Sequence, residues 1–211
     1  MTDSWQIVLA IESAICGGSI SLLRDGDEIA HWTGTSNISK AEDLLINIDE
    51  LLSSNNILRN EIGLIAVSAG PGSFTGIRIG IATALGLKAG LGIEMSSESA
   101  LKAMAFSQPV SEKIVAAIPM GRNAVCWQSF QKQTGIAIAL DEPRTMPEET
   151  FLSMVLKETH AAFVLHTALY EKASHAKSII DFGANIAYAI GIICRPNTGV
   201  VTEPLFISKS F

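Results

Sequence analysis

A glycine-rich turn constrains the fold of this chain more than any other feature of its sequence. The turn reads Gly70-Pro71-Gly72-Ser73-Phe74-Thr75-Gly76 and follows an apolar, β-branched run at residues 64–69, which predicts a buried strand. A helix is expected over about residues 75–89, followed by a short strand around Ile93. A strand, a turn, a helix and a second strand in this order form the unit that builds a parallel sheet.

The residues before this unit predict an antiparallel meander and one helix. Strands are expected at residues 6–11, 19–23 and 28–32, and Asp25-Gly26-Asp27 has the composition of a tight turn between the last two. Ser39 can cap a helix over residues 41–52, with Glu42 completing a capping box. The apolar positions of this helix recur at helical spacing and predict one stripe: Leu44, Leu45, Ile48, Leu51 and Leu52.

The second half of the chain repeats this opening weakly. Strands are expected at residues 114–118, 124–130, 135–140 and 162–165, and helices at residues 97–107, 147–156 and 175–190. Residues 202–207 are expected to be extended, because Pro204 excludes a helix. The element order indicates an α/β, actin-like or sugar-kinase-like (ribonuclease-H-like) fold. Its two half-domains would divide near Glu98 into residues 1–98 and 99–211.

Charge and cysteine content exclude several classes of protein. The 211 residues carry a net charge of -6, whereas a protein that grips nucleic acid by itself needs clustered Lys and Arg. Cys16, Cys126 and Cys194 have no metal-ligand spacing, which indicates free thiols in a reducing compartment. No signal sequence is visible, and the longest apolar stretch, residues 186–194, is about half a membrane span. A soluble, cytoplasmic protein is expected.

Three interpretations of the glycine-rich turn compete. Its backbone could cradle a phosphate, but Gly76 is followed by Ile77 rather than by the Lys of a P-loop, and the spacing also misses the dinucleotide fingerprint. It could be purely structural, with Ser73 or Thr75 capping the helix. Alternatively, Gly76, Gly80 and Ala84 recur every four residues and form a small-residue face that another helix could approach closely.

Three segments of the chain resemble the TsaB (YeaZ) family. Residues 70–80 are similar to the G-P-G-S-F-T-G-[hydrophobic]-R-[hydrophobic]-G signature of that family. Leu9-Ala10-Ile11-Glu12-Ser13 resembles its L-A-I-D-T start, and Glu203-Pro204-Leu205-Phe206-Ile207 resembles its closing E-P-x-Y-L. The order and spacing of these segments fit a chain of this length, so the resemblance spans nearly the whole protein.

The resemblance implies a non-catalytic dimerisation subunit with two actin-like half-domains, the second reduced, and with no metal or cofactor of its own. Such proteins pair with a larger homologous, metal-dependent subunit that transfers a threonylcarbamoyl group to adenosine in tRNA. A small ATPase joins the pair, tRNA is reached only through the complex, and a homodimer is expected when the chain is alone. The contact maps onto helices at residues 41–52 and 75–87, with these interface residues: Leu44, Leu45, Ile48, Leu52, Gly76, Arg78, Gly80, Ile81 and Ala84.

The chain also departs from the family pattern. Lys40 stands where many relatives have a His before the first helix. Pro119-Met120-Gly121, followed by Arg122, replaces an Asp-Ala-Arg run, and Cys126 replaces a Tyr. These changes leave the central signature intact.

Two other functions are compatible with the sequence. An actin-like ATPase or phosphotransferase could use the opening turn as a phosphate hairpin, with Glu12 near the place of the Asp that holds magnesium, together with Ser13, Gly17 and Gly18. No second acidic motif supports this activity. A homodimeric structural protein without a catalytic partner is the other alternative.

Histidine and serine positions argue against two further classes of enzyme. His31, His160, His166 and His175 are never three or four residues apart, so no helix offers a metal-binding pair, and His160 and His166 are expected at surface turns. Ser73 does not lie in the G-x-S-x-G elbow of a serine hydrolase.

Overall fold

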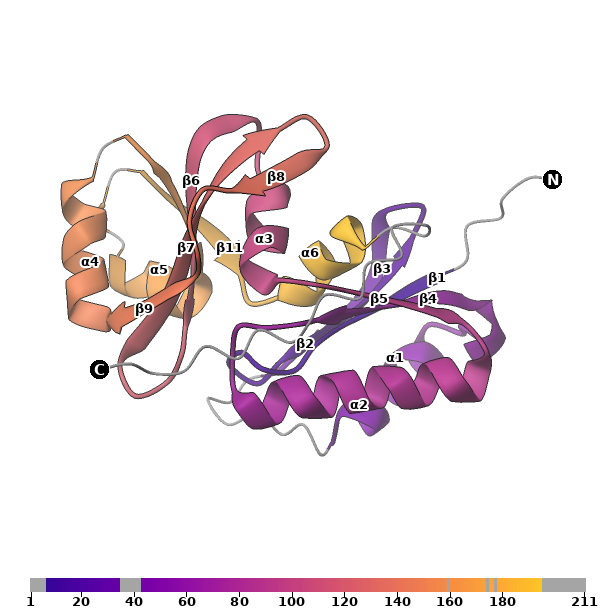
Figure 1. Ribbon diagram of the computed structural model, residues 1–211. Coiled ribbons are helices and arrows are strands. Elements are labelled where there is room, and N and C mark those ends of the chain that lie inside the picture. Colours follow the sequence, from indigo (N-terminus) through magenta and orange to yellow (C-terminus); the bar gives the residue numbers. More distant parts are fainter. Residues whose placement is uncertain (1–6, 35–42, 159, 174, 177, 195–211) are drawn as a thin grey trace.

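β1 (Ile7–Glu12), β2 (Ser19–Arg24) and β3 (Asp27–Thr33) form the expected antiparallel meander. The computed structural model describes residues 7–34, 43–158, 160–173, 175–176 and 178–194 (Figure 1). Left-handed backbone at Asp25 (φ 57°) and Gly26 (φ 90°) makes the turn between β2 and β3. A turn of this kind matches the twist of the two strands that it joins. The predicted strands and their turn are confirmed.

The glycine-rich unit joins this meander through parallel strands. β4 (Ile62–Ser68) lies parallel to β1, and β5 (Glu94–Glu98) lies parallel to β4, so the sheet has the order β3-β2-β1-β4-β5. α2 (Phe74–Leu91) is the crossover between them and ends at Gly92, whose left-handed φ of 67° caps the helix. The predicted strand, turn, helix and strand are confirmed.

α1 (Leu44–Ser54) supplies the helix expected over residues 41–52 and precedes a short 3-10 turn at Arg59–Glu61. The predicted capping box at Ser39 and Glu42 lies outside the described residues. Leu44, Ile48 and Leu52 are buried, whereas Leu45 is 56% exposed. The single stripe was wrong at Leu45, because consecutive residues point about 100° apart around a helix.

A second sheet follows α3 (Ala100–Phe106). β6 (Ser111–Pro119), β7 (Ala124–Gln133) and β8 (Ile136–Ala139) repeat the antiparallel meander, and β9 (Arg144–Pro147) also pairs with β7. After α4 (Glu148–Lys157), the parallel strands are β10 (Ala162–His166) and β11 (Ile179–Gly183), with α5 (Thr167–Ala173) between them. The order is β11-β10-β6-β7-β8. Both halves therefore combine a meander with parallel strands, as the predicted fold requires.

The helix expected over residues 175–190 was wrong. This segment contains β11, which lies parallel to β10, and the start of α6 (Ile186–Ile193). Gly183, with a left-handed φ of 87°, separates the strand from the helix. The sequence analysis also missed β9 and α5, which are short elements stabilised by their neighbours rather than by their own periodicity.

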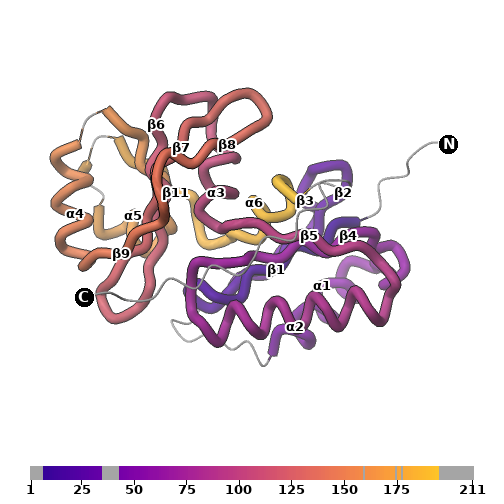
Figure 2. The backbone as a smooth tube through the Cα atoms, viewed as in Figure 1, coloured from indigo at the N-terminus to yellow at the C-terminus, as the bar shows by residue number. Residues whose placement is uncertain are grey.

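Helices form three layers around the two sheets (Figures 1 and 2). α1 and α2 pack on one face of the first sheet, and α4 and α5 pack on the outer face of the second. α3 and α6 lie between the sheets and share one core with both. This core joins Ala10 and Ala66 of the first sheet to Ile118 and Phe130 of the second.

α6, at the end of the described chain, packs on the first sheet and is hydrogen-bonded to it. The backbone N–H of Ala187 donates to Ser19 Oγ at 3.0 Å, and Asn185 Nδ2 donates to Glu28 Oε1 at 2.7 Å. Gly191 lets the helix approach closely, because a Cβ there would lie 2.5 Å from Leu23 Cδ1. The two halves therefore share structure through α6.

Candidate functional site

The glycine-rich turn packs directly on the turn that follows β1. The backbone N–H of Ser73 donates to Ala14 O at 2.8 Å, and Ser13 Oγ donates to Gly76 O at 2.9 Å. A Cβ on Gly76 would lie 2.3 Å from Ser13 O, and a Cβ on Gly80 would lie 2.3 Å from Ser13 Oγ. The small-residue face of α2 therefore serves close packing within the chain.

Ser73 caps α2, as the structural interpretation of the turn expected. Its backbone is extended, and its Oγ accepts from the N–H of Gly76 at 3.3 Å. Such a cap satisfies one of the N–H groups that a helix start leaves without an intrahelical partner.

The Glu12 carboxyl lies inside the first hairpin and is 1% exposed. It accepts from the backbone N–H groups of Ala14 at 2.6 Å and Ile15 at 3.3 Å, so both oxygens are engaged by the turn that follows it. Burial raises the pKa of Glu12 to about 8, against the lowering effect of these two hydrogen bonds. A carboxyl that is largely protonated at neutral pH and already hydrogen-bonded is poorly placed to hold magnesium.

A cleft of about 630 Å³ separates the two halves. The first hairpin contributes Ala14 and Cys16 to its wall, and the start of α2 contributes Ser73, Thr75 and Gly76. Glu12, Ser13, Gly17 and Gly18, the predicted phosphate hairpin, are all absent from this wall. Ser13 lies in the contact between the turns, and Glu12 is hydrogen-bonded to the turn that follows it. Gly18 packs on Glu12, and Gly17 lies against Gly34.

The opposite wall of the cleft comes from the second half. The turn between β6 and β7 places Pro119, Met120 and Gly121 there, followed by Arg122. Lys172 of α5 also lines the cleft, and its Nζ contacts both carboxylate oxygens of Glu148 at 2.8 and 2.9 Å. The atypical stretch identified in the sequence is thus part of the wall of this cleft.

The interface residues predicted from the resemblance divide into two groups. Six are buried against the chain's own sheet and first hairpin: Leu44, Ile48, Leu52, Gly76, Gly80 and Ala84. Ile48 and Leu52 also line the space between α1 and α2, and Gly76 lines the cleft, so the part of these residues in a partner contact stays a prediction. Leu45 and Arg78 are exposed, and Ile81 is half-buried.

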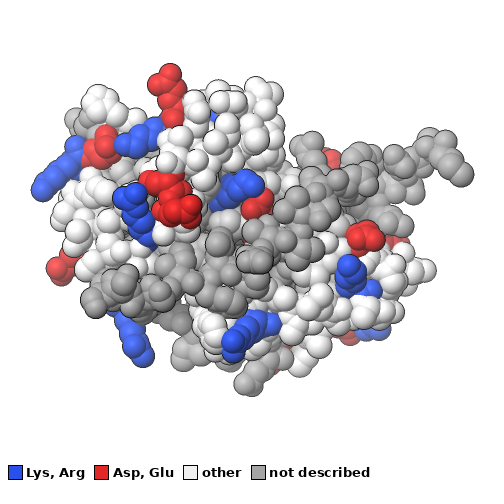
Figure 3. Space-filling model, viewed as in Figure 1, with Lys and Arg blue, Asp and Glu red and all other residues white. Residues whose placement is uncertain are grey.

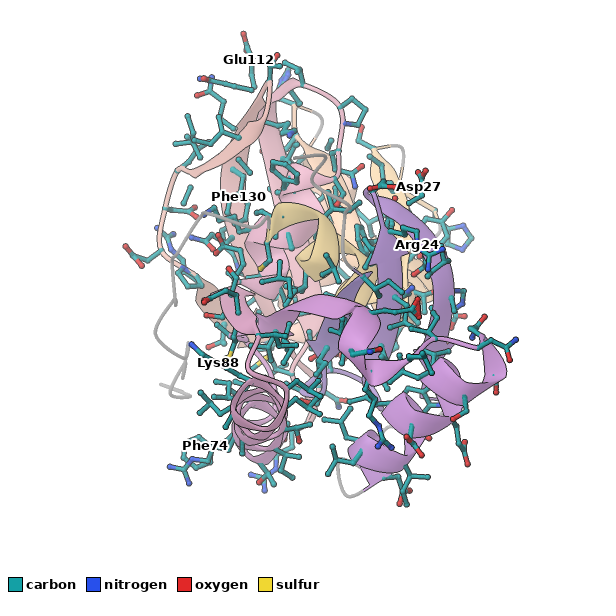
Figure 4. The ribbon with its side chains drawn as sticks, turned by 90° about the vertical axis from the view of Figure 1, so that its right-hand side faces the viewer. Arg24, Asp27, Phe74, Lys88, Glu112 and Phe130 are labelled. Atoms are coloured by element: carbon teal, nitrogen blue, oxygen red, sulfur yellow. The ribbon has the colours of Figure 1, made fainter. Side chains whose placement is uncertain are left out.

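Exposed apolar side chains outside the predicted interface residues extend this surface. Ile46 of α1 and Phe74 and Leu85 of α2 are all about half exposed. Phe74 projects from the end of α2 in Figure 4, and the Arg78 guanidinium lies 3.7 Å from the centre of its ring. These positions face away from the buried stripe, and that orientation around the helix was the signal that could have identified them.

A groove of about 420 Å³ runs between α1 and α2. Leu45, Ile46, Leu87 and Leu91 line it, and the ion pair of Asp49 and Arg59 lies at its edge. α2 is long and apolar enough to cross a membrane by length and composition alone, with a mean hydropathy of 1.2 and 22% of it buried. One such helix is weak evidence for a membrane span. The two helices present an apolar surface of the kind that helix packing covers.

His166 corrects one expectation. It was expected at a surface turn, but it ends β10 and is buried. Burial lowers the pKa of His166 to about 4, although the nearby Asp181 carboxylate acts to raise it. Its Nδ1 lies 3.2 Å from the backbone N–H of Ala168 and accepts from it, so the ring helps to fix the start of α5.

Charged side chains are mixed on the face of the molecule shown in Figure 3. Lys and Arg lie among Asp and Glu there and form no continuous basic patch. This distribution agrees with the net charge of -6. The visible face therefore lacks the clustered cations that grip a phosphate backbone.

Comparison with known proteins finds relatives by sequence and by structure. Residues 37–188 match the family described as TsaD: tRNA N6-adenosine threonylcarbamoyltransferase. The chain is 31% identical over 128 residues to the tRNA threonylcarbamoyladenosine biosynthesis protein TsaB of Escherichia coli, a match that covers 59% of this chain and 55% of that protein. It is 33% identical over 129 residues to the protein of the same name from Haemophilus influenzae, with coverage of 60% and 54%. The chain thus spans about half the length of these curated relatives.

The structural comparison supports the fold. YeaZ from Pseudomonas aeruginosa superposes with a TM-score of 0.64 at 22% identity, over 88% of this chain and 90% of that chain. The actin-like, sugar-kinase-like fold expected from the element order is confirmed. The resemblance to TsaB (YeaZ) proteins is likewise confirmed.

Two glycines of α2 test the contact between the turns. We expect Gly76→Ala to destabilise the chain by about 1–3 kcal/mol, because its Cβ would overlap Ser13 O. Gly86→Ala is the matched control, since no atom lies within 4 Å of its Cβ position, and it should add about 0.5–1 kcal/mol through helix propensity. Urea unfolding measures both free energies, and equal effects of the two changes would contradict the proposed contact.

The raised pKa of Glu12 predicts a pH-dependent effect of Glu12→Gln. Between pH 4.5 and about 8 the folded carboxyl keeps a proton that the unfolded chain releases, so wild-type stability from this group falls as pH rises. The variant should therefore gain melting temperature relative to wild type from pH 5 to pH 8. His166 is held neutral in the folded chain, so stability is lost at low pH, where the unfolded chain's imidazole binds a proton. This loss is the same in both proteins and cancels in the comparison. Glu112→Gln, at an exposed position, controls for net charge, and a difference that stays constant with pH would contradict the assignment.

Proposed function

The chain belongs to the tRNA N6-adenosine threonylcarbamoyltransferase (TsaD) family and is of the TsaB (YeaZ) type within it, and from this premise we propose that it acts in forming threonylcarbamoyladenosine in tRNA as a non-catalytic subunit. Its task would be to pair with a larger homologous subunit that carries the transferase chemistry. The complex would also contain a small ATPase. The chain alone would form a homodimer, and the complex would work in the cytoplasm.

The exposed apolar surface of α1 and α2 is the observation that carries this proposal. Leu45, Ile46, Phe74 and Leu85 are large apolar side chains exposed on two neighbouring helices. The groove between these helices offers a partner helix a place to pack. Interfaces between subunits typically have an apolar centre with aromatic and Arg side chains, and Phe74 with Arg78 supplies such a pair.

The state of the first hairpin supports a non-catalytic role. Phosphotransfer in a fold of this kind needs a carboxylate that holds magnesium beside the phosphates. Glu12 is buried, and its oxygens accept from the turn that follows it. The neighbouring Ser13 is hydrogen-bonded to α2. This arrangement argues against the ATPase alternative.

Charge supports contact with tRNA through partners. A net charge of -6 repels a polyanion, and the face in Figure 3 shows no basic stripe. We therefore propose that the other subunits of the complex bind tRNA. This chain would contribute contacts that hold the subunits together.

Leu45→Glu and Leu85→Glu test the pairing surface. Each places a charge in an apolar interface, so we expect at least a tenfold weaker affinity for the larger subunit of the same organism, with the fold intact. Val110→Glu is the control, because Val110 is 67% exposed in the turn between α3 and β6 and should leave pairing unchanged. Light scattering and titration calorimetry measure the complex, and melting temperature reports the fold.

The same preparations separate the scaffold from the ATPase. The isolated chain should show no magnesium-dependent ATP hydrolysis, and the reconstituted complex should modify tRNA. The Leu45→Glu and Leu85→Glu variants should lower that modification in proportion to the lost pairing. Robust hydrolysis by the isolated chain, or pairing that survives both changes, would refute the proposal.

A further inference from the structure

β8 is an edge of the second sheet and carries no charged side chain. Within the described ranges its one neighbouring strand is β7, to which it is joined by a tight turn with left-handed backbone at Gly135. The strands at the other three ends of the sheets, β3, β5 and β11, carry acidic side chains: Asp27, Glu28, Glu94, Glu98 and Asp181. Charges, Pro residues and bulges are the usual means by which an edge strand avoids pairing with another chain. Residues 134–140 contain no charge and no Pro, so β8 is an edge open to pairing.

The outer face of β8 is apolar and exposed. Ile136, Ile138 and Leu140 are all exposed, whereas Ala137 is buried in the core that α3 shares with the second sheet. Alternate residues of a strand point to opposite faces, so the three large side chains form one row. The hairpin of β7 and β8 lies at the top of the molecule in Figure 1, at the opposite end from α1 and α2. A partner on the helix surface would therefore leave this row accessible.

The hydrogen bonds between β7 and β8 show which backbone groups of β8 face the open edge. The N–H of Leu140 donates to Ser129 O at 2.9 Å, so these two residues form a hydrogen-bonded pair. Such pairs alternate along an antiparallel ladder, so Ile136 and Ile138 also direct their backbone groups toward β7. Ala137 and Ala139 then direct their N–H and C=O groups toward the open edge, where a further strand can bond.

A second copy of β8 complements this edge when it runs antiparallel about a twofold axis at Ile138. Ala137 would exchange hydrogen bonds with Ala139 of the second copy. Ile138 would face its own copy in a pair without hydrogen bonds, the type in which side chains lie closest. Ile136 would face Leu140, and Asp141 would face Gly135, so no like charges would meet.

We propose that two copies of this chain pair through β8 in this register and join their second sheets into one. Twofold pairing uses the edge of both copies, so the assembly closes at two. β8 has four residues, and interfaces below about 1,000 Å² are weak, so the pairing is strongest where partners hold the copies at high local concentration. This surface is distinct from the helix surface of the function proposed above, and pairing through it would join two complexes.

Disulfide formation tests the register. In the paired copies the Cα atoms of residue 138 would lie about 4.5 Å apart, within disulfide range, whereas those of residue 140 would lie roughly 13 Å apart. Under mild oxidation with diamide, Ile138→Cys should form a disulfide-linked dimer at least about tenfold faster than Leu140→Cys. Leu140 is the more exposed position, so random collisions favour this control. Wild type, with its three free cysteines, gives the background.

A charge on the axis tests the strength of the same contact. Ile138→Lys would place two like charges opposite each other, and we expect the dissociation constant of the pair to rise about tenfold. Ile29→Lys is the matched control, because Ile29 lies on the edge strand β3 and is 38% exposed, against 37% for Ile138. Sedimentation at up to about 1 mM chain measures both changes in a Leu85→Glu background, which is designed to remove pairing through α2. Melting temperature reports the fold of each variant.

Three results would overturn the proposal. The first is equal cross-linking at residues 138 and 140, and the second is an equal dissociation constant for the two Lys variants. The third is an Ile138→Lys variant that loses pairing with the larger subunit while its self-association is unchanged, which would assign the edge to that subunit. Cross-linking at residue 138 does not depend on the helix surface, so it separates this inference from the function proposed above.

Discussion

The backbone contact between the turn after β1 and the turn after β4 is the constraint on which the rest of the first half depends. These turns follow adjacent parallel strands, so they meet at one edge of the sheet. Ser73 N–H donates to Ala14 O there, and Ser13 Oγ donates to Gly76 O. Side chains on the glycines would separate the turns, since a Cβ on Gly72 would lie 2.5 Å from Ala14 Cβ. The glycine signature thus reflects packing, and α2 lies close to the sheet because of it.

Burial also determines what the first hairpin can do chemically. Glu12 is 1% exposed, and this burial raises the pKa of its carboxyl to about 8. The backbone then uses both of its oxygens. The carboxyl that the sequence analysis placed near the position of a magnesium ligand is thus engaged by the chain's own backbone.

Sequence periodicity predicted the elements that have strong patterns of their own. β1 to β5 with α1 and α2 were predicted, because turn residues and apolar spacing agree there. The direction of the small-residue face could not be predicted, since Gly76, Gly80 and Ala84 could contact a partner or the chain's own hairpin. The interrupted segment from β11 to α6 was missed, because its strand depends on pairing with β10.

α2 connects the two surfaces that matter most for a scaffold. Its first turn supplies Ser73 and Thr75 to the wall of the cleft between the halves, and its outer face presents Phe74 and Leu85. Near its start, its inner face packs closely on the hairpin through Gly76 and Gly80, which lie against Ser13. A partner on the outer face would then lie about one helix diameter, roughly 10 Å, from the cleft. A helix packed in this way would hold a partner in a defined position, which is what the proposed role as a dimerisation subunit requires.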